Sequence, residues 1–160
     1  MKKAFISVYT LLVLLIVSLS ITFIYNQQKS SSDYARSLYD KKKAQYLAES
    51  ILNSFMDEKS DRIGRLIIDD YDKKFTDNKT RLVDELFYKY EGKTYKITIS
   101  KVYHPHRKEL NGLYMIFPEK IKVGESTAMA EIYVKVFDKK DEINEKYDKN
   151  RLRIEIRHTY

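Results

Sequence analysis

The sequence predicts an α+β protein in which one long N-terminal helix packs on a small antiparallel sheet. Three observations predict this fold. Residues 5–25 carry no charged side chain, neither glycine nor proline occurs before Gly64, and alternating apolar residues appear only in the second half of the chain. A chain of 160 residues holds at most one ordinary domain beyond its apolar segment. We therefore expect one small domain attached to the helix.

The apolar segment has the length of a membrane span. Residues 5–25 read FISVYTLLVLLIVSLSITFIY, and a helix of this length measures about 31 Å, which matches the hydrocarbon core of a bilayer. Lys2 and Lys3 precede the segment, so the positive-inside rule places the N-terminus in the cytoplasm and the remaining chain outside. A cleaved secretory signal is disfavoured because the apolar run is too long and ends in FIYNQQ rather than in small residues.

Residues 26–56 are predicted to continue this helix as an amphipathic segment. Apolar residues recur there every three or four positions, which places them on one face of a helix. Such a stripe needs an apolar partner, and we expect that partner to be a sheet within a globular head formed by residues 57–160. The stripe consists of Tyr34, Leu38, Ala44, Leu47, Ala48, Ile51, Leu52 and Phe55.

Three segments alternate between apolar and polar residues and are predicted to be strands. In the first, a turn at Glu91-Gly92-Lys93 precedes the alternating residues. Antiparallel pairing is expected because no crossover helices separate the strands. The inward-facing sets are Tyr95, Ile97 and Ile99; Ile132, Val134 and Val136, with Glu131, Tyr133 and Lys135 facing solvent; and Leu152, Ile154 and Ile156.

The segments between the long helix and these strands give weaker patterns. Apolar residues every four positions from Ile63 to Phe75, and helical spacing from Leu82 to Tyr90, predict one or two short helices. Residues 103–125 hold both prolines and two of the four glycines. They are predicted to form an irregular connection with a short strand at residues 113–117.

Composition excludes several kinds of chemistry. The chain has no cysteine, which excludes disulfides, thiolate nucleophiles and zinc–thiolate sites. No nucleophile elbow, phosphate-binding loop or HExxH motif occurs. We expect no enzymatic activity and no cofactor. The net charge is +7, and it is +5 without Lys2 and Lys3, since 28 basic residues then face 23 acidic ones.

Two groups of residues could bind a metal ion, although solvated side chains are the favoured interpretation for both. His104, His106 and His158 could form a three-histidine site. A second group could bind calcium, but the glycine and terminal glutamate of an EF-hand are missing. This acidic cluster consists of Asp69, Asp70, Asp72 and Asp77.

Basic residues interleaved with tyrosines raise the possibility of direct DNA binding. Acidic residues lie between them in the sequence, so a solvated strand face is favoured over a DNA-binding surface. The basic residues are Lys93, Lys96, Lys101, Arg151, Arg153 and Arg157, and the tyrosines are Tyr95 and Tyr103.

The leader Met-Lys-Lys-Ala of residues 1–4, directly before Phe5, resembles that of a type IV prepilin. The stretch KAQYLAESILN, in which Tyr46, Leu47, Ala48 and Glu49 match outright, resembles the A-x-Y-L-A-E-x-G-L-N signature of minor pilins. The match is closest to minor pilins of Gram-positive competence and pilus systems and to tip-type minor pilins. Residue 50 is serine and residue 51 isoleucine, where that signature has glycine and leucine.

This resemblance implies a pilin-like head and a processed N-terminus. A prepilin peptidase would cleave between Ala4 and Phe5, and Phe5 would be N-methylated. Ala4 departs from the usual glycine. The glutamate usual five residues into the mature chain is replaced by Tyr9, and the apolar stretch lacks the glycine and proline of major pilins.

The resemblance implies a structural minor pilin or pseudopilin with Ser7 and Tyr9 at the assembly site. Its partners would be other minor pilins, the major pilin, the prepilin peptidase and the cell membrane, and after assembly it would lie in a surface filament. The absence of an acid at Tyr9 favours a subunit that initiates assembly or lies at the tip. The alternative is a solitary signal-anchored extracellular binding domain. An adhesion or motility pilus, a DNA-uptake pilus and a secretion pseudopilus all remain open.

Overall fold

The computed structural model describes residues 2–73, 79–137 and 151–160. Its chain forms two compact units, Met1–Asp40 and Lys41–Tyr160, and helix α1 (Lys2–Asp72) contributes to both. The remaining elements belong to the second unit. They are β1 (Arg81–Tyr90), β2 (Lys93–Lys101), the short 3₁₀ helix η1 (Lys108–Leu110), β3 (Tyr114–Pro118), β4 (Ile121–Val123), β5 (Ser126–Ala128), β6 (Ala130–Val136) and β7 (Leu152–Thr159).

In the first unit, α1 exposes all its described side chains up to Tyr39. Two polar residues within the apolar segment bond to the helix itself. Ser20 Oγ donates to the carbonyl of Ile16 and Thr22 Oγ1 to the carbonyl of Ser18, both at 2.9 Å. These bonds satisfy the hydroxyl donors without water, as a lipid environment requires. By length and composition this part of α1 could cross a membrane.

In the second unit, α1 buries one stripe against the sheet, as the helical spacing predicts. The stripe begins at Ala44 rather than at Tyr34, since Tyr34 and Leu38 are exposed. The helix also extends beyond residue 56, through a bend at Lys59 (φ −112°, ψ 15°), to Asp72. The buried residues of this stripe are Ala44, Ala48, Ile51, Leu52, Phe55, Ile63 and Ile67.

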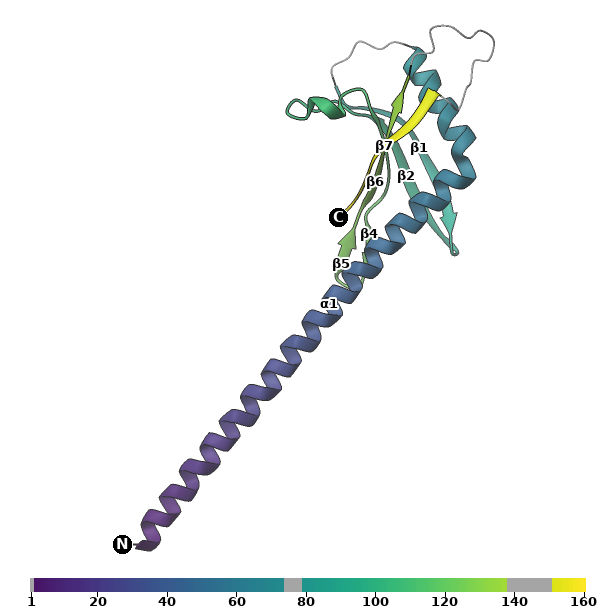
Figure 1. The fold of residues 1–160 in the computed structure, drawn as a ribbon. Helices are drawn as coiled ribbons and strands as arrows, with labels where there is room; N and C mark the ends of the chain where they lie inside the picture. The colour runs from purple at the N-terminus through teal and green to yellow at the C-terminus, as the bar shows by residue number, and fades with distance from the viewer. Residues whose placement is uncertain (1, 74–78, 138–150) are drawn as a thin grey trace. The chain divides into compact units, whose positions relative to one another are not determined.

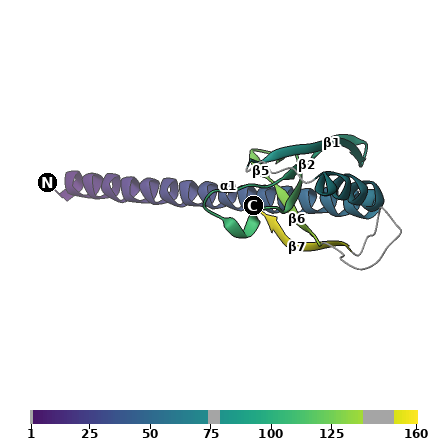
Figure 2. The same ribbon diagram turned by 90° about the horizontal axis from the view of Figure 1, so that it is seen from above.

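The main sheet has the strand order β1-β2-β3-β6-β7, and every neighbouring pair is antiparallel. A separate hairpin joins β4 to β5. The predicted antiparallel sheet is confirmed, including the strand expected near residues 113–117. Figure 1 shows the sheet and the C-terminal part of α1 as two layers, and Figure 2 shows β1 and β7 on opposite sides of the helix.

The short helix predicted at Leu82 to Tyr90 is wrong, because this segment is strand β1. Its pairing with β2 closes through a two-residue loop in which Glu91 and Gly92 have φ of 46° and 80°. Two positive φ values define the turn that fits the twist of a hairpin. A register shift between Leu82 and Asp84 breaks the alternation and leaves apolar residues at helix-like spacing. The helix predicted from Ile63 to Phe75 is the last part of α1 as far as Asp72, and Phe75 lies outside the described residues.

A bulge in β7 changes the face on which Ile156 lies. Tyr133 pairs with Ile156 whereas Val134 pairs with Ile154, so the register shifts at Glu155. An extra residue at a bulge reverses the side on which the following side chains point. Ile154 therefore lies on the same face of the sheet as Val134, and Ile156 lies on the opposite face. The uninterrupted alternation expected from the sequence had placed both on one face.

The two faces of the sheet carry separate apolar clusters. The face toward α1 holds the main core, in which Phe55 packs edge-on against Tyr88 at a ring-centroid distance of 5.5 Å. The opposite face is covered by the chain around η1, whose Leu110 and Leu113 pack with Tyr133. Glu131 and Tyr133, expected to face solvent, are consequently buried.

We expect Ile51→Asp to destabilise a fragment of residues 26–160 by more than about 4 kcal/mol, because a carboxylate would replace a fully buried side chain in the helix–sheet core. We expect this fragment to fold as a soluble monomer, and thermal unfolding followed by circular dichroism measures the effect. Tyr46→Asp introduces the same residue on the exposed side of the same helix and should change stability little. A melting temperature for Ile51→Asp within a degree or two of wild type would refute the proposed core.

Candidate functional site

The residues to which the resemblance assigns processing and assembly lie at the start of α1. Ala4, Phe5 and Ser7 belong to helical turns whose side chains lie outside the described part of the structure. Tyr9 is described, and its side chain is exposed. The helix therefore places residues 5 and 9 one turn apart, with a side chain at position 9 that is available to another molecule.

The matching stretch Tyr46 to Glu49 divides between the core and the surface. Ala48 is fully buried and Leu47 packs against the core, whereas Tyr46 and Glu49 are exposed. Glu49 borders a hollow of about 520 Å³ between α1 and the ends of β6 and β7. The stretch thus supplies a structural contact through its inner residues, and its outer residues are exposed to solvent.

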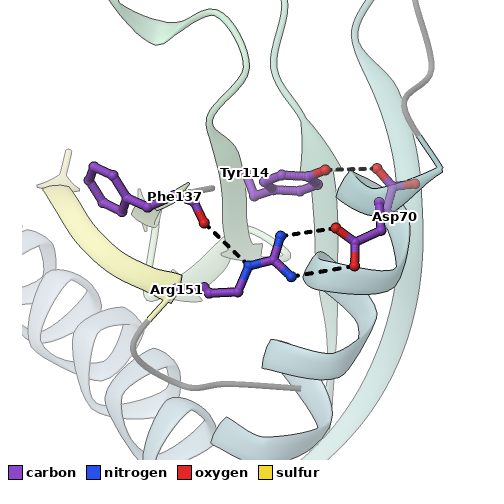
Figure 3. A network of polar contacts seen from close by, with 5 residues as sticks. Asp70, Tyr114, Phe137 and Arg151 are labelled. Atoms are coloured by element: carbon purple, nitrogen blue, oxygen red, sulfur yellow. Dashed lines mark hydrogen bonds and ion pairs between the residues drawn. The ribbon is translucent and has the colours of Figure 1, made fainter. Parts of the chain in front are cut away.

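Asp70 anchors the last turn of α1 to the sheet. Its carboxylate accepts hydrogen bonds from the Arg81 guanidinium of β1. It also accepts one at 2.9 Å from the Tyr114 hydroxyl of β3 (Figure 3). Both Asp70 and Tyr114 are buried. Burial, followed by the hydrogen bond to Asp70, raises the pKa of Tyr114 above that of a free tyrosine. The network thus joins the helix to an edge strand and to the central strand.

Asp72 makes a second anchor at the opposite edge of the sheet. Arg151, just before β7, donates from Nη2 to Asp72 Oδ1 at 2.9 Å and from Nε to the carbonyl of Phe137 at 3.2 Å (Figure 3). Carboxylates near a helix C-terminus oppose the helix dipole. The arginines that face Asp70 and Asp72 offset this repulsion, so the end of α1 depends on contacts with the sheet.

The candidate metal ligands do not converge. In the described part of the chain, no group of three or more histidine and acidic side chains could hold a metal ion. Asp70 and Asp72 bind arginines instead, and Asp77 lies outside the described residues. His104 Nδ1 accepts from the backbone N–H groups of His106 and Arg107 at 3.2 and 3.1 Å. This imidazole orders its own loop.

Several of the basic residues considered for DNA binding make contacts within the protein. Lys96 pairs with Glu85 at 2.7 Å, and Lys101 Nζ lies 5.8 Å from the centroid of the Tyr114 ring. Arg157 donates to Asn53 at 2.8 Å. The ion pair of Lys96 with Glu85, like that of Arg151 with Asp72, offsets part of the positive charge that these residues would offer to a polyanion.

Glu131 is a buried carboxylate that the sequence pattern did not reveal. Its Oε2 accepts from the Tyr133 hydroxyl at 3.0 Å, and its Oε1 accepts from the Tyr160 hydroxyl. Strand alternation placed Glu131 on a solvated face. The sequence clue to its burial was Leu110 and Leu113, apolar residues of the connection between β2 and β3 that pack over this face of the sheet.

The structure defines an α+β protein with a long apolar helix that is compatible with a single membrane span. No family model, no curated protein and no solved structure matches the chain.

We predict that the domain loses stability above pH 10 as its bonded tyrosines ionise. Burial and, second, its hydrogen bond to Glu131 raise the pKa of Tyr133 to about 12. For Tyr160, its own hydrogen bond to Glu131 and, second, burial raise the pKa to about 12. Since a free tyrosine has a pKa near 10, this stability is complete below pH 10 and is lost as the pH rises through about 12. Denaturant unfolding at several pH values measures the loss.

The control is a variant with both Tyr133→Phe and Tyr160→Phe, which cannot ionise at these positions. Its stability should fall less between pH 10 and pH 12 than that of the wild type. An equal fall in both proteins would show that other groups cause the alkaline destabilisation.

Proposed function

We propose that this protein is a minor pilin or pseudopilin of a type IV filament, placed at the tip or at the start of assembly. The observation that carries the proposal is the combination, in one chain, of the basic leader before Phe5, the uncharged segment of residues 5–25 and the Tyr46 to Glu49 stretch. The helix–sheet fold supports it, because α1 combines a membrane-compatible segment with a stripe that holds a head domain.

Tyr9 is the basis for the proposed position. In the family that the chain resembles, a glutamate at this position is held to neutralise the N-terminal amine of a neighbouring subunit. An unpaired charge in hydrocarbon costs several kcal/mol, so a subunit within the shaft needs that acid. A subunit that begins the filament has no preceding neighbour and tolerates a tyrosine.

The second candidate is a solitary signal-anchored binding domain. The N-terminus would then remain uncleaved, and the apolar segment would hold a single head at the outer face of the cell membrane without assembly partners. The two candidates differ in the chemistry of the N-terminus and in whether the protein occurs in filaments.

We predict that mass spectrometry of the protein from its native cells finds a chain that begins with N-methylated Phe5. Ala4→Arg should block this maturation, because a large charged side chain replaces a small residue at the cleavage position. The control is Lys43→Arg, which introduces an arginine at an exposed position, leaves the leader and the core unchanged, and should mature normally. Intact Met1 in cells with active peptidase would favour the solitary anchor.

We further predict that Tyr9→Phe assembles normally, whereas Tyr9→Glu is neutral or harmful. A tip subunit gains from Tyr9→Glu only an unpaired carboxyl group within lipid. Immunogold labelling of filaments and quantification of incorporated subunits measure both effects, and wild-type label should be confined to few copies near one end. Label along the whole shaft, or better incorporation of Tyr9→Glu, would contradict the tip position.

A further inference from the structure

Two carboxylates with different partners are buried in the described part of the head. Asp70 and Glu131 are 6% and 8% exposed. Asp70 accepts from one tyrosine and is neutralised by Arg81. Glu131 accepts from two tyrosine hydroxyls, and in the described part of the chain no lysine or arginine forms an ion pair with it. Glu131 therefore lacks the cation that neutralises Asp70. Burial of a carboxylate without such a cation is unfavourable.

A hollow of about 540 Å³ lies beside Glu131 on the face of the sheet that the η1 segment covers. Leu110 and Ile156 give this hollow an apolar wall, and the two tyrosines that bond to Glu131 also line it. The space is therefore next to the carboxylate and is bordered by both apolar and aromatic side chains.

The charges around the hollow favour a cation. Arg107 and Glu109 line it with opposite charges, so among its lysine, arginine, aspartate and glutamate residues the one left without a counter-charge in the lining is Glu131. Arg107 lies outside ion-pair distance of Glu131. An anion would meet a buried negative charge, and the described residues offer no cluster that could hold a metal ion.

The occupied positions on Glu131 restrict the shape of this cation. Each carboxylate oxygen already accepts one tyrosine hydroxyl, which disfavours the two parallel bonds of a planar guanidinium. An ammonium group is compact, has three donors that rotate, and interacts favourably with the faces of tyrosine rings. Leu110 and Ile156 would cover an attached alkyl chain.

We propose that this hollow binds a primary alkylammonium group, with Glu131 as its counter-ion, Tyr133 and Tyr160 holding the carboxylate in place, and Leu110 and Ile156 packing on the alkyl stem. Two sources present this chemistry: a lysine side chain of a partner protein and a free polyamine. The proposal concerns the head alone and does not depend on filament assembly.

The test titrates pentylamine into the full chain in detergent micelles, with ¹³C-labelled isoleucine methyl groups observed by NMR. We expect a saturable shift of the Ile156 signal at millimolar pentylamine. Pentanol has the same stem without the charge and should give no saturable shift. Absence of saturable binding of pentylamine, or equal binding of pentanol, would overturn the proposal.

Glu131→Gln keeps the size of the side chain and removes the charge, and it should weaken pentylamine binding at least about tenfold. Glu155→Gln makes the same change on β7 at a residue that does not line the hollow and should leave affinity unchanged. Equal affinities for Glu131→Gln and the wild type would overturn the proposal.

Arg107→Gln tests the site without altering a buried group, because Arg107 is exposed. Removal of this positive charge from the lining should strengthen pentylamine binding severalfold. This variant decides the question even if Glu131→Gln does not fold. Unchanged or weaker binding would place the ligand elsewhere and overturn the proposal.

Two further probes distinguish the sources of the ammonium group. Tighter binding of N-acetyl-lysine methylamide than of spermidine would assign the site to a lysine side chain of a protein. The reverse order would assign it to a polyamine. Failure of both probes to compete with pentylamine would overturn the proposed ligand class.

Discussion

The burial of one stripe of α1 against one face of the sheet is the contact on which the head depends. Ala44 and Ala48 are completely buried at the start of this stripe, and small side chains let backbones approach closely. Further along, Ile51 and Phe55 fill the space over the strands. Each fully buried large apolar side chain contributes about 1.5 to 3 kcal/mol. Without the helix, the central strands would expose their inner apolar face to water.

Buried polar groups then fix how the helix and the sheet meet. Asp70 and Asp72 are two residues apart on α1 and bond to arginines near opposite edges of the sheet. Apolar packing alone tolerates small rotations and translations, whereas charged hydrogen bonds require particular distances and angles. The end of α1 therefore has one favoured position on the sheet, and Tyr114 adds a bond at its centre.

The sequence predicted the parts of the fold that depend on local periodicity. The long helix, the strands at residues 95–99 and 132–136 and the antiparallel sheet follow from spacing and turn residues. The same reasoning failed at two bulges, where an extra residue at Leu82 to Asp84 and at Glu155 reverses the alternation. The position of a bulge depends on the partner strand, which local spacing does not reveal. The pairing of Asp70 with Arg81 was equally inaccessible, since it depends on how the sheet folds back on the helix. The burial of Glu131 depends on the η1 segment, whose path over the sheet has no sequence period.

The arrangement of α1 has a mechanical consequence for the head. Residues 44 to 67 contact the sheet at many points along the helix, and the two aspartate anchors lie at the far end of this contact. A load pulling on Ala44 toward the start of the helix acts along the axis of the part before the bend at Lys59, so the contacts from Ala44 to Phe55 bear it together as shear instead of opening one after another. The strands of the sheet stay outside the direct line of tension, because the force reaches them only through the helix.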